Sequence, residues 1–406
     1  MKNSSNSSSP ILLAFSGGLD TSFCVPWLKQ NYGREVITAT IDTGGIDTRA
    51  AGDLEQRSRE LGAIEHLLID AKNAFFERVL RYLVFGNVRR GHLYPLCVGA
   101  ERGLQAAELA RLAVDRGADT VAHGCTAAGN DQVRFEVALR TLAPDLQILA
   151  PVRDNRWSRD DQVSYLKQHG MPVPARGSAY SINRGLWGIT IGGRETLSSE
   201  GSLPEDAWVL SAEAFSRPQE ASHHSVDFER GIPVALDGKA LAPVALIESV
   251  ETIAGRYGIG RGIHLGDTVL GTKGRVAFEA PAAEVLITAH RELEKLTLSA
   301  QQMRIKDAVA AHYGDLVHEG RQLDPACRDI EALLASSQSR VTGRVRFTLR
   351  PGNLFVTGVT SPWSLLAATR GVYGEAAGEW TPEDALGYSK ILSLSGMLQT
   401  RAGEAA

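Results

Sequence analysis

The chain has 406 residues, of which 43% are hydrophobic and 22% are charged, and its formal net charge is −4 at pH 7. This length exceeds one ordinary hydrophobic core and predicts two domains plus a tail, while the acidic balance argues against a nucleic-acid partner. No apolar run approaches the ~20 residues that span a bilayer, so no membrane partner is expected. The four cysteines stand far apart and match no zinc or disulfide pattern, which predicts reduced thiols in a cytoplasmic protein.

Residues 1–10 lack the apolar core of a signal peptide and are rich in Asn and Ser, so we expect a disordered tail there. The region 11–170 then alternates short apolar runs with helical patterns, which predicts an α/β domain with a parallel sheet. The expected strands cover residues 11–15, 36–41, 67–69, 120–122 and 148–152. Helices are expected between them, notably over residues 54–61, 75–84 and 104–114, and Ser158 with Asp161 forms the capping box of another helix.

The second half of the chain has a different pattern of predicted strands and helices. Two prolines in Met171–Pro174 suit a domain boundary, and residues 171–370 read as an α+β domain. Strands at 226–228 and 234–236 can pair, a helix is expected over 281–296, and 341–349 with 354–359 reads as a hairpin. One more helix is expected over 381–399, within the C-terminal segment 371–406. Its apolar stripe, which includes Tyr388 and Leu392, has to cover either the chain's own body or a partner subunit.

The motif with the most chemical content is Ala14–Ser22, between the first expected strand and the next helix. Gly17 and Gly18 let the backbone turn tightly, so that amide groups point at an anion with a helix N-terminus behind them. Because a carboxylate beside phosphates is repulsive without a cation, we assign Asp20 a role near Mg²⁺. Hydroxyl donors come from Ser16, Thr21 and Ser22.

This loop is not a Walker A motif, because no Gly-Lys-Ser/Thr follows it. It is similar to the pyrophosphate-binding loop of enzymes that split ATP between the α and β phosphates. Taken alone it also fits synthetases for NAD, GMP and asparagine, and RNA-modifying enzymes. The alternative without a ligand is a plain strand–Gly-Gly–helix turn.

A second polar group follows the fourth expected strand, at the carboxyl edge of the sheet where ligands bind in open α/β folds. Asn130 and Asp131 precede an expected helix, and a role as helix caps is the alternative to ligand binding. Arg134 lies about one turn later on a similar side and offers a planar fork for a carboxylate; otherwise it is a surface arginine.

Together, Ala14–Ser22 and Asn130–Glu136 resemble the argininosuccinate synthase family. The similarity covers nearly the whole chain, through Pro172–Pro174, Tyr180–Ser181, Leu186–Gly188, Gly192–Gly193, Ser339–Gly343 and Gly387–Ile391. It implies an adenine-nucleotide domain of the PP-loop ATP pyrophosphatase type over 11–170, an α+β synthetase domain over 171–370 and a C-terminal oligomerisation helix within 371–406. It also implies a cytoplasmic homotetramer.

The resemblance further implies an AMP-forming ligase. The ureido oxygen of citrulline attacks the α-phosphate of ATP and releases pyrophosphate, and the amine of aspartate then displaces AMP to form argininosuccinate. ATP is the implied cosubstrate, with Mg²⁺. The implied ATP site is Ala14, Phe15, Ser16, Gly17, Gly18, Leu19, Asp20, Thr21, Ser22, Ile41 and Gly124. The implied aspartate site is Thr126, Asn130 and Asp131. The implied citrulline site is Tyr94, Asn130, Arg134, Ser181 and Thr190. The residues expected to act in catalysis are Ser16, Asp20, Asp131 and Arg134.

The sequence departs from the family around one end of the citrulline. Cys97-Val98-Gly99 replaces a segment with two hydroxyls, Gly266 stands where the family has a glutamate near the amino group, and Phe278 replaces a tyrosine. An ammonium left unpaired in a closed site costs roughly 3–5 kcal/mol. Two neighbouring acids are candidates to compensate: Glu101 and Asp267.

These departures leave other functions open. One hypothesis is an acceptor without a free ammonium, such as an N-acylated citrulline or another ureido compound. A second is a non-catalytic nucleotide-binding relative, although the phosphate loop and the Asn130–Arg134 group remain. A third is an RNA-thiolating enzyme that uses Cys97 or Cys125, against which the acidic balance argues. His123 is expected to be a hydrogen-bonded structural histidine.

Overall fold

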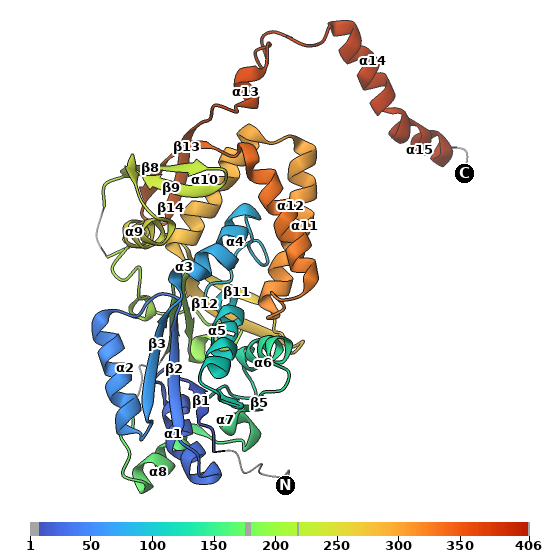
Figure 1. The fold of residues 1–406 in the computed structure, drawn as a ribbon. Helices are drawn as coiled ribbons and strands as arrows, with labels where there is room; N and C mark the ends of the chain where they lie inside the picture. The colour runs from blue at the N-terminus through green and yellow to red at the C-terminus, as the bar shows by residue number, and fades with distance from the viewer. Residues whose placement is uncertain (1–7, 175–179, 217–218, 405–406) are drawn as a thin grey trace.

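The computed structural model describes residues 8–174, 180–216 and 219–404, which form a body and a C-terminal arm (Figure 1). The disordered tail predicted over residues 1–10 falls mostly on residues 1–7, which lie outside the described residues. Among the described residues, no helix combines the length and the apolar character that crossing a bilayer would need.

The N-terminal part of the body is built on a five-stranded sheet in which all neighbouring strands are parallel. Its spatial order is β3 (Glu65–Asp70), β2 (Val36–Asp42), β1 (Ile11–Ala14), β4 (Thr120–Ala122) and β5 (Gln147–Leu149). The predicted parallel sheet is therefore confirmed. The fifth strand is shorter than predicted, because Pro151 begins a short helix, α7 (Pro151–Asp154).

Alternate residues of a strand point to opposite faces of a sheet, and β1 buries both kinds. Ile11 and Leu13 join the apolar cluster of α1 (Leu19–Tyr32) and α8 (Arg159–Gln168). Leu12 joins the cluster of α5 (Arg102–Asp115) and α6 (Asp131–Leu142) on the other face. Helices on both faces explain why β1 is a continuous apolar run instead of an alternating one.

The N-terminal part of the body contains several more helical segments. They are α2 (Thr48–Glu60), α3 (Lys72–Phe75), the π-helical turn η1 (Phe76–Leu80), α4 (Arg81–Phe85) and the 3₁₀ turn η2 (Gly99–Glu101). The helix predicted over 75–84 is thus interrupted by a π-helical turn. The capping box of α8 is confirmed: Ser158 accepts from the amide of Asp161, and the Asp161 side chain accepts from the amide of Ser158.

The second part of the body carries two antiparallel sheets. One has the order β10 (Lys239–Ala240), β9 (Ile232–Leu236), β8 (Ser222–Glu229), β13 (Gly343–Arg350) and β14 (Asn353–Thr360). The other has the order β11 (Arg261–Asp267), β12 (Lys273–Glu279), β7 (Gly188–Gly192) and β6 (Ser181–Gly185). Both predicted hairpins are confirmed, because β8 pairs with β9 and β13 pairs with β14.

Four long helices complete this α+β part: α9 (Pro243–Gly255), α10 (Pro281–Thr297), α11 (Ala300–His318) and α12 (Pro325–Ser337). The predicted helix over 281–296 is confirmed as α10. An ion pair joins α10 to α11, with 3.1 Å between Lys306 Nζ and Glu294 Oε2, and both side chains are 0% exposed. The same carboxylate accepts from Asn87 and Gln338, so one buried charge pair ties four segments together.

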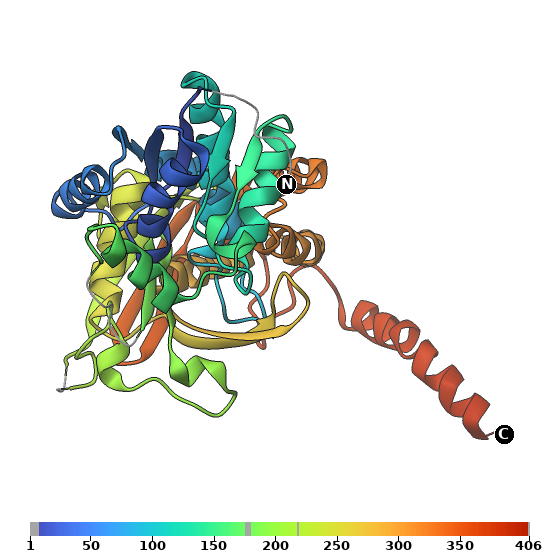
Figure 2. The same ribbon diagram turned by 90° about the horizontal axis from the view of Figure 1, so that it is seen from below.

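The C-terminal arm consists of α13 (Leu365–Ala368), α14 (Pro382–Leu392) and α15 (Leu394–Glu404). Its last two helices stand away from the body in both views (Figures 1 and 2). The prediction of one helix over 381–399 is wrong, because the chain divides into two helices at Ser393. Apolar side chains on both helices face solvent, including Tyr388 at 66%, Ile391 at 69% and Leu398 at 61% exposure.

The buried ion pair makes a testable prediction about stability. Lys306→Met leaves the Glu294 carboxylate buried without its cation, and we expect it to destabilise the protein by about 3–5 kcal/mol. Arg344→Met is the matched control: Arg344 pairs with Asp227 at the surface and is 48% exposed, and we expect little change in stability because exposed ion pairs contribute little. Urea-induced unfolding measures both. Equal effects of the two substitutions would contradict the role given to the buried pair.

Candidate functional site

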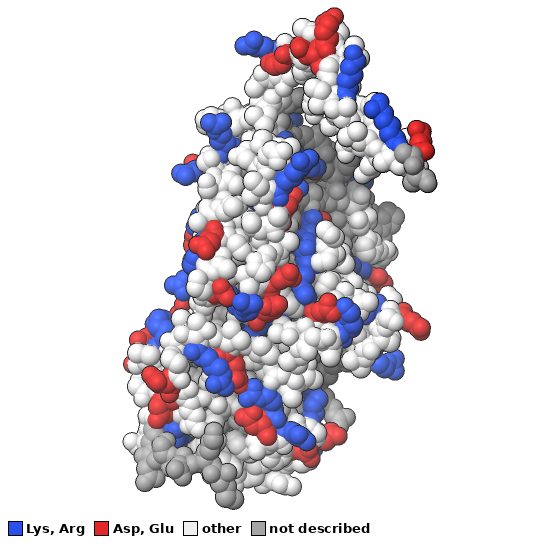
Figure 3. Space-filling view, turned by 90° about the vertical axis from the view of Figure 1, so that its right-hand side faces the viewer, with Lys and Arg blue, Asp and Glu red and all other residues white. Residues whose placement is uncertain are grey.

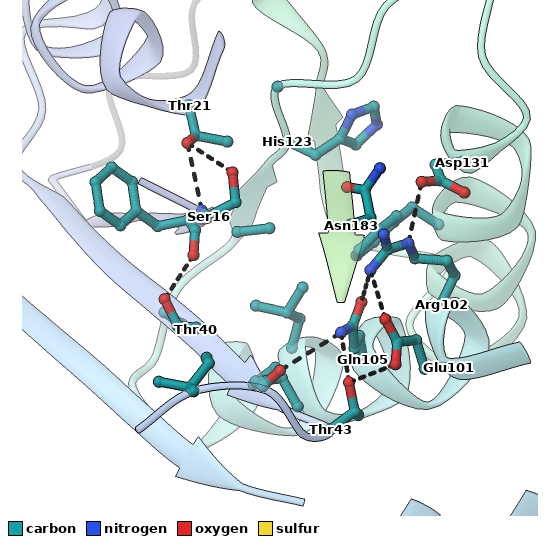
Figure 4. Close-up of a pocket in the computed structure, with 18 of the residues that line it drawn as sticks. Ser16, Thr21, Thr40, Thr43, Glu101, Arg102, Gln105, His123, Asp131 and Asn183 are labelled. Carbon is teal, nitrogen blue, oxygen red and sulfur yellow. Dashed lines mark hydrogen bonds and ion pairs between the residues drawn. The ribbon is translucent and has the colours of Figure 1, made fainter. Parts of the chain in front are cut away.

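A pocket of about 520 Å³ lies at the carboxyl edge of the parallel sheet. Its walls include residues that follow β1 and β4 and residues at the end of β2. Ile182, Asn183 and Arg184 of β6 also line the pocket, so a strand from the second part of the chain closes it (Figure 4). Backbone contact fixes this closure, since the amide of Leu186 donates to the carbonyl of Thr43 at 2.9 Å.

The glycine loop turns sharply at the end of β1. Gly17 has a φ of 72°, and a Cβ added there would lie 2.6 Å from the Leu54 side chain. Gly18 is the N-cap of α1 in extended conformation, so the loop leads directly into the N-terminus of that helix. The Gly17 carbonyl accepts from Arg57, which ties the loop to α2. The loop therefore has the backbone geometry that an anion-binding turn requires.

Most residues implied for ATP gather here. Those that line the pocket are Ala14, Phe15, Ser16, Asp20, Thr21, Ile41 and Gly124. The rest continue the loop and the first turn of α1: Gly17, Gly18, Leu19 and Ser22. Close packing of Gly124 explains its residue type, because a Cβ there would lie 2.9 Å from the Thr21 side chain and 3.1 Å from the Thr21 amide nitrogen.

A polar wall opposite the loop was not predicted as part of the nucleotide site. Thr43 Oγ1 donates to Glu101 Oε2 at 2.9 Å and accepts from Gln105 Nε2 at 3.0 Å. Arg102 Nη1 donates to Gln105 Oε1 at 2.8 Å (Figure 4). Burial raises the pKa of the Glu101 carboxyl to about 7, although Arg102 and the Thr43 hydroxyl act to lower it. Burial is therefore the dominant influence on this acid.

Asp131 lies at the boundary between this pocket and the residues implied for the acceptor. Its two oxygens receive Arg102 Nε at 3.0 Å and Arg134 Nη1 at 2.8 Å. Burial alone would raise the pKa of the Asp131 carboxyl, but the two guanidinium groups hold it below its usual range. Asp131 therefore stays ionised and links α5 to α6 by charge.

Arg134 is 6% exposed, so its alternative as a surface arginine is wrong. Its Nε donates to the carbonyl of His318 at 2.7 Å, and its Nη2 lies 3.2 Å from His318 Nδ1. Burial, followed by Arg134 and Arg90, lowers the pKa of His318 to about 3. The imidazole is therefore neutral near pH 7, and its Nδ1 accepts from Arg134. These contacts hold the guanidinium beside Asp131 and leave N–H groups on Nη1 and Nη2 without a partner among the described residues.

The other implied substrate residues come from several elements. Asn130 Oδ1 accepts from the Val269 amide at 2.9 Å, which ties the loop to the hairpin of β11 and β12. The predicted capping role of the Asn130 side chain is wrong, because its oxygen is used in that contact. Ser181 begins β6 beside the pocket, and Thr190 lies on β7 between β6 and β12. Thr126 is exposed in the loop that precedes α6.

Tyr94 is buried next to Arg134. Its hydroxyl donates to the carbonyl of Cys97 at 2.5 Å, and the amide of Gly99 donates to the same oxygen at 2.7 Å. Gly99 lies against the guanidinium, since a Cβ there would be 3.4 Å from Arg134 Cζ. The segment that departs from the family is therefore in contact with the implied acceptor residues.

Both acids proposed as substitutes for the missing glutamate are engaged elsewhere. Asp267 is exposed and pairs with Lys273 at 2.5 Å. Glu101 bonds to Thr43 and pairs with Arg102 at 3.2 Å. His123 is hydrogen-bonded, as predicted, through one ring nitrogen. Its Nδ1 accepts from the Cys125 amide at 3.3 Å, and burial lowers the pKa of the imidazole to about 4.

The surface carries both signs of charge. On the face shown in Figure 3, Lys and Arg side chains alternate with Asp and Glu side chains over the whole height of the molecule. Nucleic-acid binding uses a basic stripe or patch, and this face presents none among the residues described.

Two family models together match most of the chain. Residues 10–172 match the Arginosuccinate synthase N-terminal HUP domain, and residues 180–399 match the Arginosuccinate synthase C-terminal domain. Curated relatives named argininosuccinate synthase are similar over nearly their full length. The relative from Xanthomonas campestris pv. campestris is 41% identical, over 97% of this chain and 98% of its own. Those from Dehalococcoides mccartyi and Methanocaldococcus jannaschii are 38% and 37% identical, over 97% and 87% of this chain and 97% and 89% of their own.

The conformation of Gly17 makes a prediction about nucleotide binding. Gly17→Ala places a side chain at positive φ and against Leu54, so the loop has to move, and we expect the KM for ATP to rise about tenfold or more. Gly52→Ala is the matched control, because Gly52 lies within α2 with no described atom within 4 Å of the added Cβ. Steady-state kinetics at varied ATP measures both. An unchanged KM in Gly17→Ala would contradict the role of the turn.

Glu101 makes a prediction about pH. Its pKa is about 7 in the folded protein and 4.5 is the ordinary value, so between these values the folded state binds more protons than the unfolded chain. Stability therefore falls as the pH rises through this window. We expect Glu101→Gln to remove that decline, so that its thermal midpoint exceeds the wild-type value at pH 8 by more than at pH 5. Glu60→Gln, at an exposed position, should leave the profile unchanged. Parallel profiles for wild type and Glu101→Gln would be the contrary result.

Proposed function

Because the chain belongs to the argininosuccinate synthase family, we propose that it joins citrulline to aspartate in an ATP-dependent ligation that releases AMP and pyrophosphate. The observation that carries this proposal is the glycine loop at the carboxyl edge of the sheet, placed beside the Asp131–Arg134 pair within a chain similar to its relatives over 97% of its length. The family's members form C–N bonds with ATP as cosubstrate. The roles of individual residues below are part of the proposal.

The first step is attack by the ureido oxygen on the α-phosphorus of ATP. A new P–O bond forms, and the bond to the β-phosphate breaks to release pyrophosphate. The backbone of the Gly17 turn, the hydroxyls of Ser16 and Thr21, and the N-terminus of α1 stabilise the charge that develops on the leaving group. Arg134 holds the acceptor's carboxylate, which places the ureido oxygen near the loop.

The second step is attack by the aspartate amine on the activated ureido carbon. The C–N bond forms, the C–O bond breaks, and AMP leaves with the former ureido oxygen. Asn130, Asp131 and Thr126 lie in the loop between β4 and α6 and are proposed to position aspartate. Because Asp131 is held by two arginines, it offers a fixed negative charge at the junction of the three substrates.

Mg²⁺ enters this proposal as a companion of ATP. No cluster of three His, Cys, Asp or Glu residues that would suit a metal ion occurs among the described residues. Mg²⁺ bound to phosphates needs only one or two protein carboxylates, and Asp20 lines the pocket beside the loop. Asp20 is therefore the residue proposed to hold it.

A cytoplasmic homotetramer is also proposed. Support for the assembly comes from the arm, whose exposed apolar residues need a surface to cover, and a second copy supplies one through the same arm. Support for the compartment comes from the cysteines, all of which are free thiols. The comparisons do not favour an N-acylated acceptor or a non-catalytic relative over ordinary argininosuccinate synthesis.

The function is tested with purified protein, ATP, Mg²⁺, aspartate and citrulline. Continued turnover, with AMP and pyrophosphate in equal amounts, is expected only when both amino acids are present. A preference for N-acetylcitrulline over citrulline would favour the N-acylated acceptor, and a protein that binds ATP without turnover would favour the non-catalytic relative. Formation of ADP would contradict the proposal altogether.

The contacts that fix Arg134 lead to a prediction about acceptor binding. Arg134→Lys removes the planar fork but retains the charge, so we expect the KM for citrulline to rise about 10- to 100-fold, with the KM for ATP changed far less. Arg140→Lys lies on the same helix with a side chain 68% exposed and should leave both constants unchanged. A citrulline KM that stays at the wild-type value in Arg134→Lys would remove Arg134 from the acceptor site.

A further inference from the structure

An aromatic stack holds Tyr94 from the side of the hairpin. The ring of His264 lies nearly parallel to that of Tyr94, with centroids 5.4 Å apart and 18° between the planes. Phe278 contacts the same tyrosine at 5.2 Å and 57°. His264 comes from β11 and Phe278 from β12, so one hairpin supplies both rings.

Glycines make this arrangement possible. Gly262, His264 and Gly266 occupy alternate positions of β11 and therefore share one face. A Cβ at Gly262 would lie 2.4 Å from the Phe278 ring, and a Cβ at Gly266 would lie 2.5 Å from His264 Nε2. The imidazole thus rests over the backbone of Gly266, in the space that any side chain at that position would enter. The ring of His264 therefore occupies the space that a glutamate side chain at residue 266 would need.

One polar atom of His264 is not used to hold the fold. Its Nε2 is buried and has no hydrogen-bond partner among the described residues. Burial, with Arg90 next, lowers the pKa of His264, so the ring is neutral near pH 7. A neutral ring laid flat on a phenol contributes through stacking and not through charge.

The stack reaches the acceptor residues through a strained segment. Tyr94 donates to the Cys97 carbonyl, which also closes a turn with the Gly99 amide, and Gly99 lies against Arg134. Val98 at the centre of this turn has a φ of 64° and a ψ of −49°. A β-branched residue in this region persists only where its surroundings hold it. Tyr94 is one of the groups that hold it.

We propose that His264 is a positioning residue of the acceptor site, which fixes Tyr94 and the Cys97–Gly99 turn beneath Arg134, and that residue 266 has to be glycine for it to do so. The inference rests on the proposed function only in taking Arg134 as the acceptor's anchor. It explains the glycine at residue 266, where the family has a glutamate, as part of a different construction of the same site. Removal of the ring loosens Tyr94, and a side chain at residue 266 displaces the ring.

The test is a double-substitution cycle with citrulline as the probe. His264→Ala and Gly266→Ala are each expected to raise the KM for citrulline about 2- to 10-fold, the range of one aromatic pair, with the KM values for ATP and aspartate within about twofold of wild type. Gly266→Ala meets only the far end of a side chain, so the protein should fold. Because Gly266→Ala acts through the ring, it should have no further effect when added to His264→Ala.

Two variants separate positioning from a merely structural role. His264→Phe keeps a ring on Tyr94 and is expected to restore the citrulline KM to within about twofold of wild type. Leu265→Ala, at an exposed position on the opposite face of β11, controls for damage to the strand. Additive effects of the two alanine substitutions, or a His264→Phe variant as impaired as His264→Ala, would overturn the proposal.

The failure of this inference is distinguishable from failure of the proposed function. If the wild-type protein made AMP and pyrophosphate while the effects of His264→Ala and Gly266→Ala were additive, only the positioning role of His264 would be rejected. If wild type consumed no ATP, crystal structures of His264→Ala and Gly266→Ala would still decide the matter. A displaced Tyr94 ring in both structures would support the inference, and an unmoved ring would refute it.

Discussion

The carboxylate of Asp131, held between Arg102 and Arg134, is the interaction on which the site depends. Arg102 belongs to the wall of the pocket proposed for ATP, and Arg134 is the proposed anchor of the acceptor, so this one carboxylate links the two halves of the proposed site. An ion triad of this kind is favourable only when each charge finds good geometry, because the desolvation of buried ions is costly. Here two further donors of Arg134 go to His318, and Arg102 Nη1 donates to Glu101 and Gln105. The result is a fixed charge pattern where the three substrates are proposed to meet, and proximity catalysis requires such fixed positions.

Glycine positions shape the site as much as charged ones do. The positive φ of Gly17 makes the sharp turn of the loop, and the lack of a side chain at Gly124 lets the fourth strand approach that loop. Gly99 serves Arg134 in the same way, and Gly266 makes room for the His264 ring. In each case the residue type is explained by the nearest atom that a Cβ would meet. Substitution at such positions moves a functional group without removing one, which is why kinetics for separate substrates discriminate between them.

The parts of the fold that local sequence determines were predictable, and the parts that depend on distant contacts were not. The strand–glycine–helix pattern of residues 11–22 and the group Asn130–Arg134 are contiguous, so periodicity and turn chemistry suffice to place them at one sheet edge. Arg102 and Gln105 lie on a helix whose polar residues look like an ordinary surface, and only the crossing of β6 turns that face into a pocket wall. His264 and His318 come from elements remote in sequence, and nothing in their own neighbourhood marks them. The division between α14 and α15 occurs at a serine, without the proline or glycine that usually signals a break. Pro151, in contrast, is a residue that often begins a helix, and the fifth strand was predicted to extend past it.

The central claim is that the glycine loop retains pyrophosphate while the ureido oxygen attacks the α-phosphorus. Citrulline labelled with ¹⁸O at the ureido position tests it most directly, because that oxygen bonds to phosphorus in the first step and leaves with it in the second. Mass spectrometry after one turnover should find the label in the phosphate of AMP, with unlabelled pyrophosphate and an unlabelled ligation product. Label that remained in the ligation product, or ADP in place of AMP, would contradict the account.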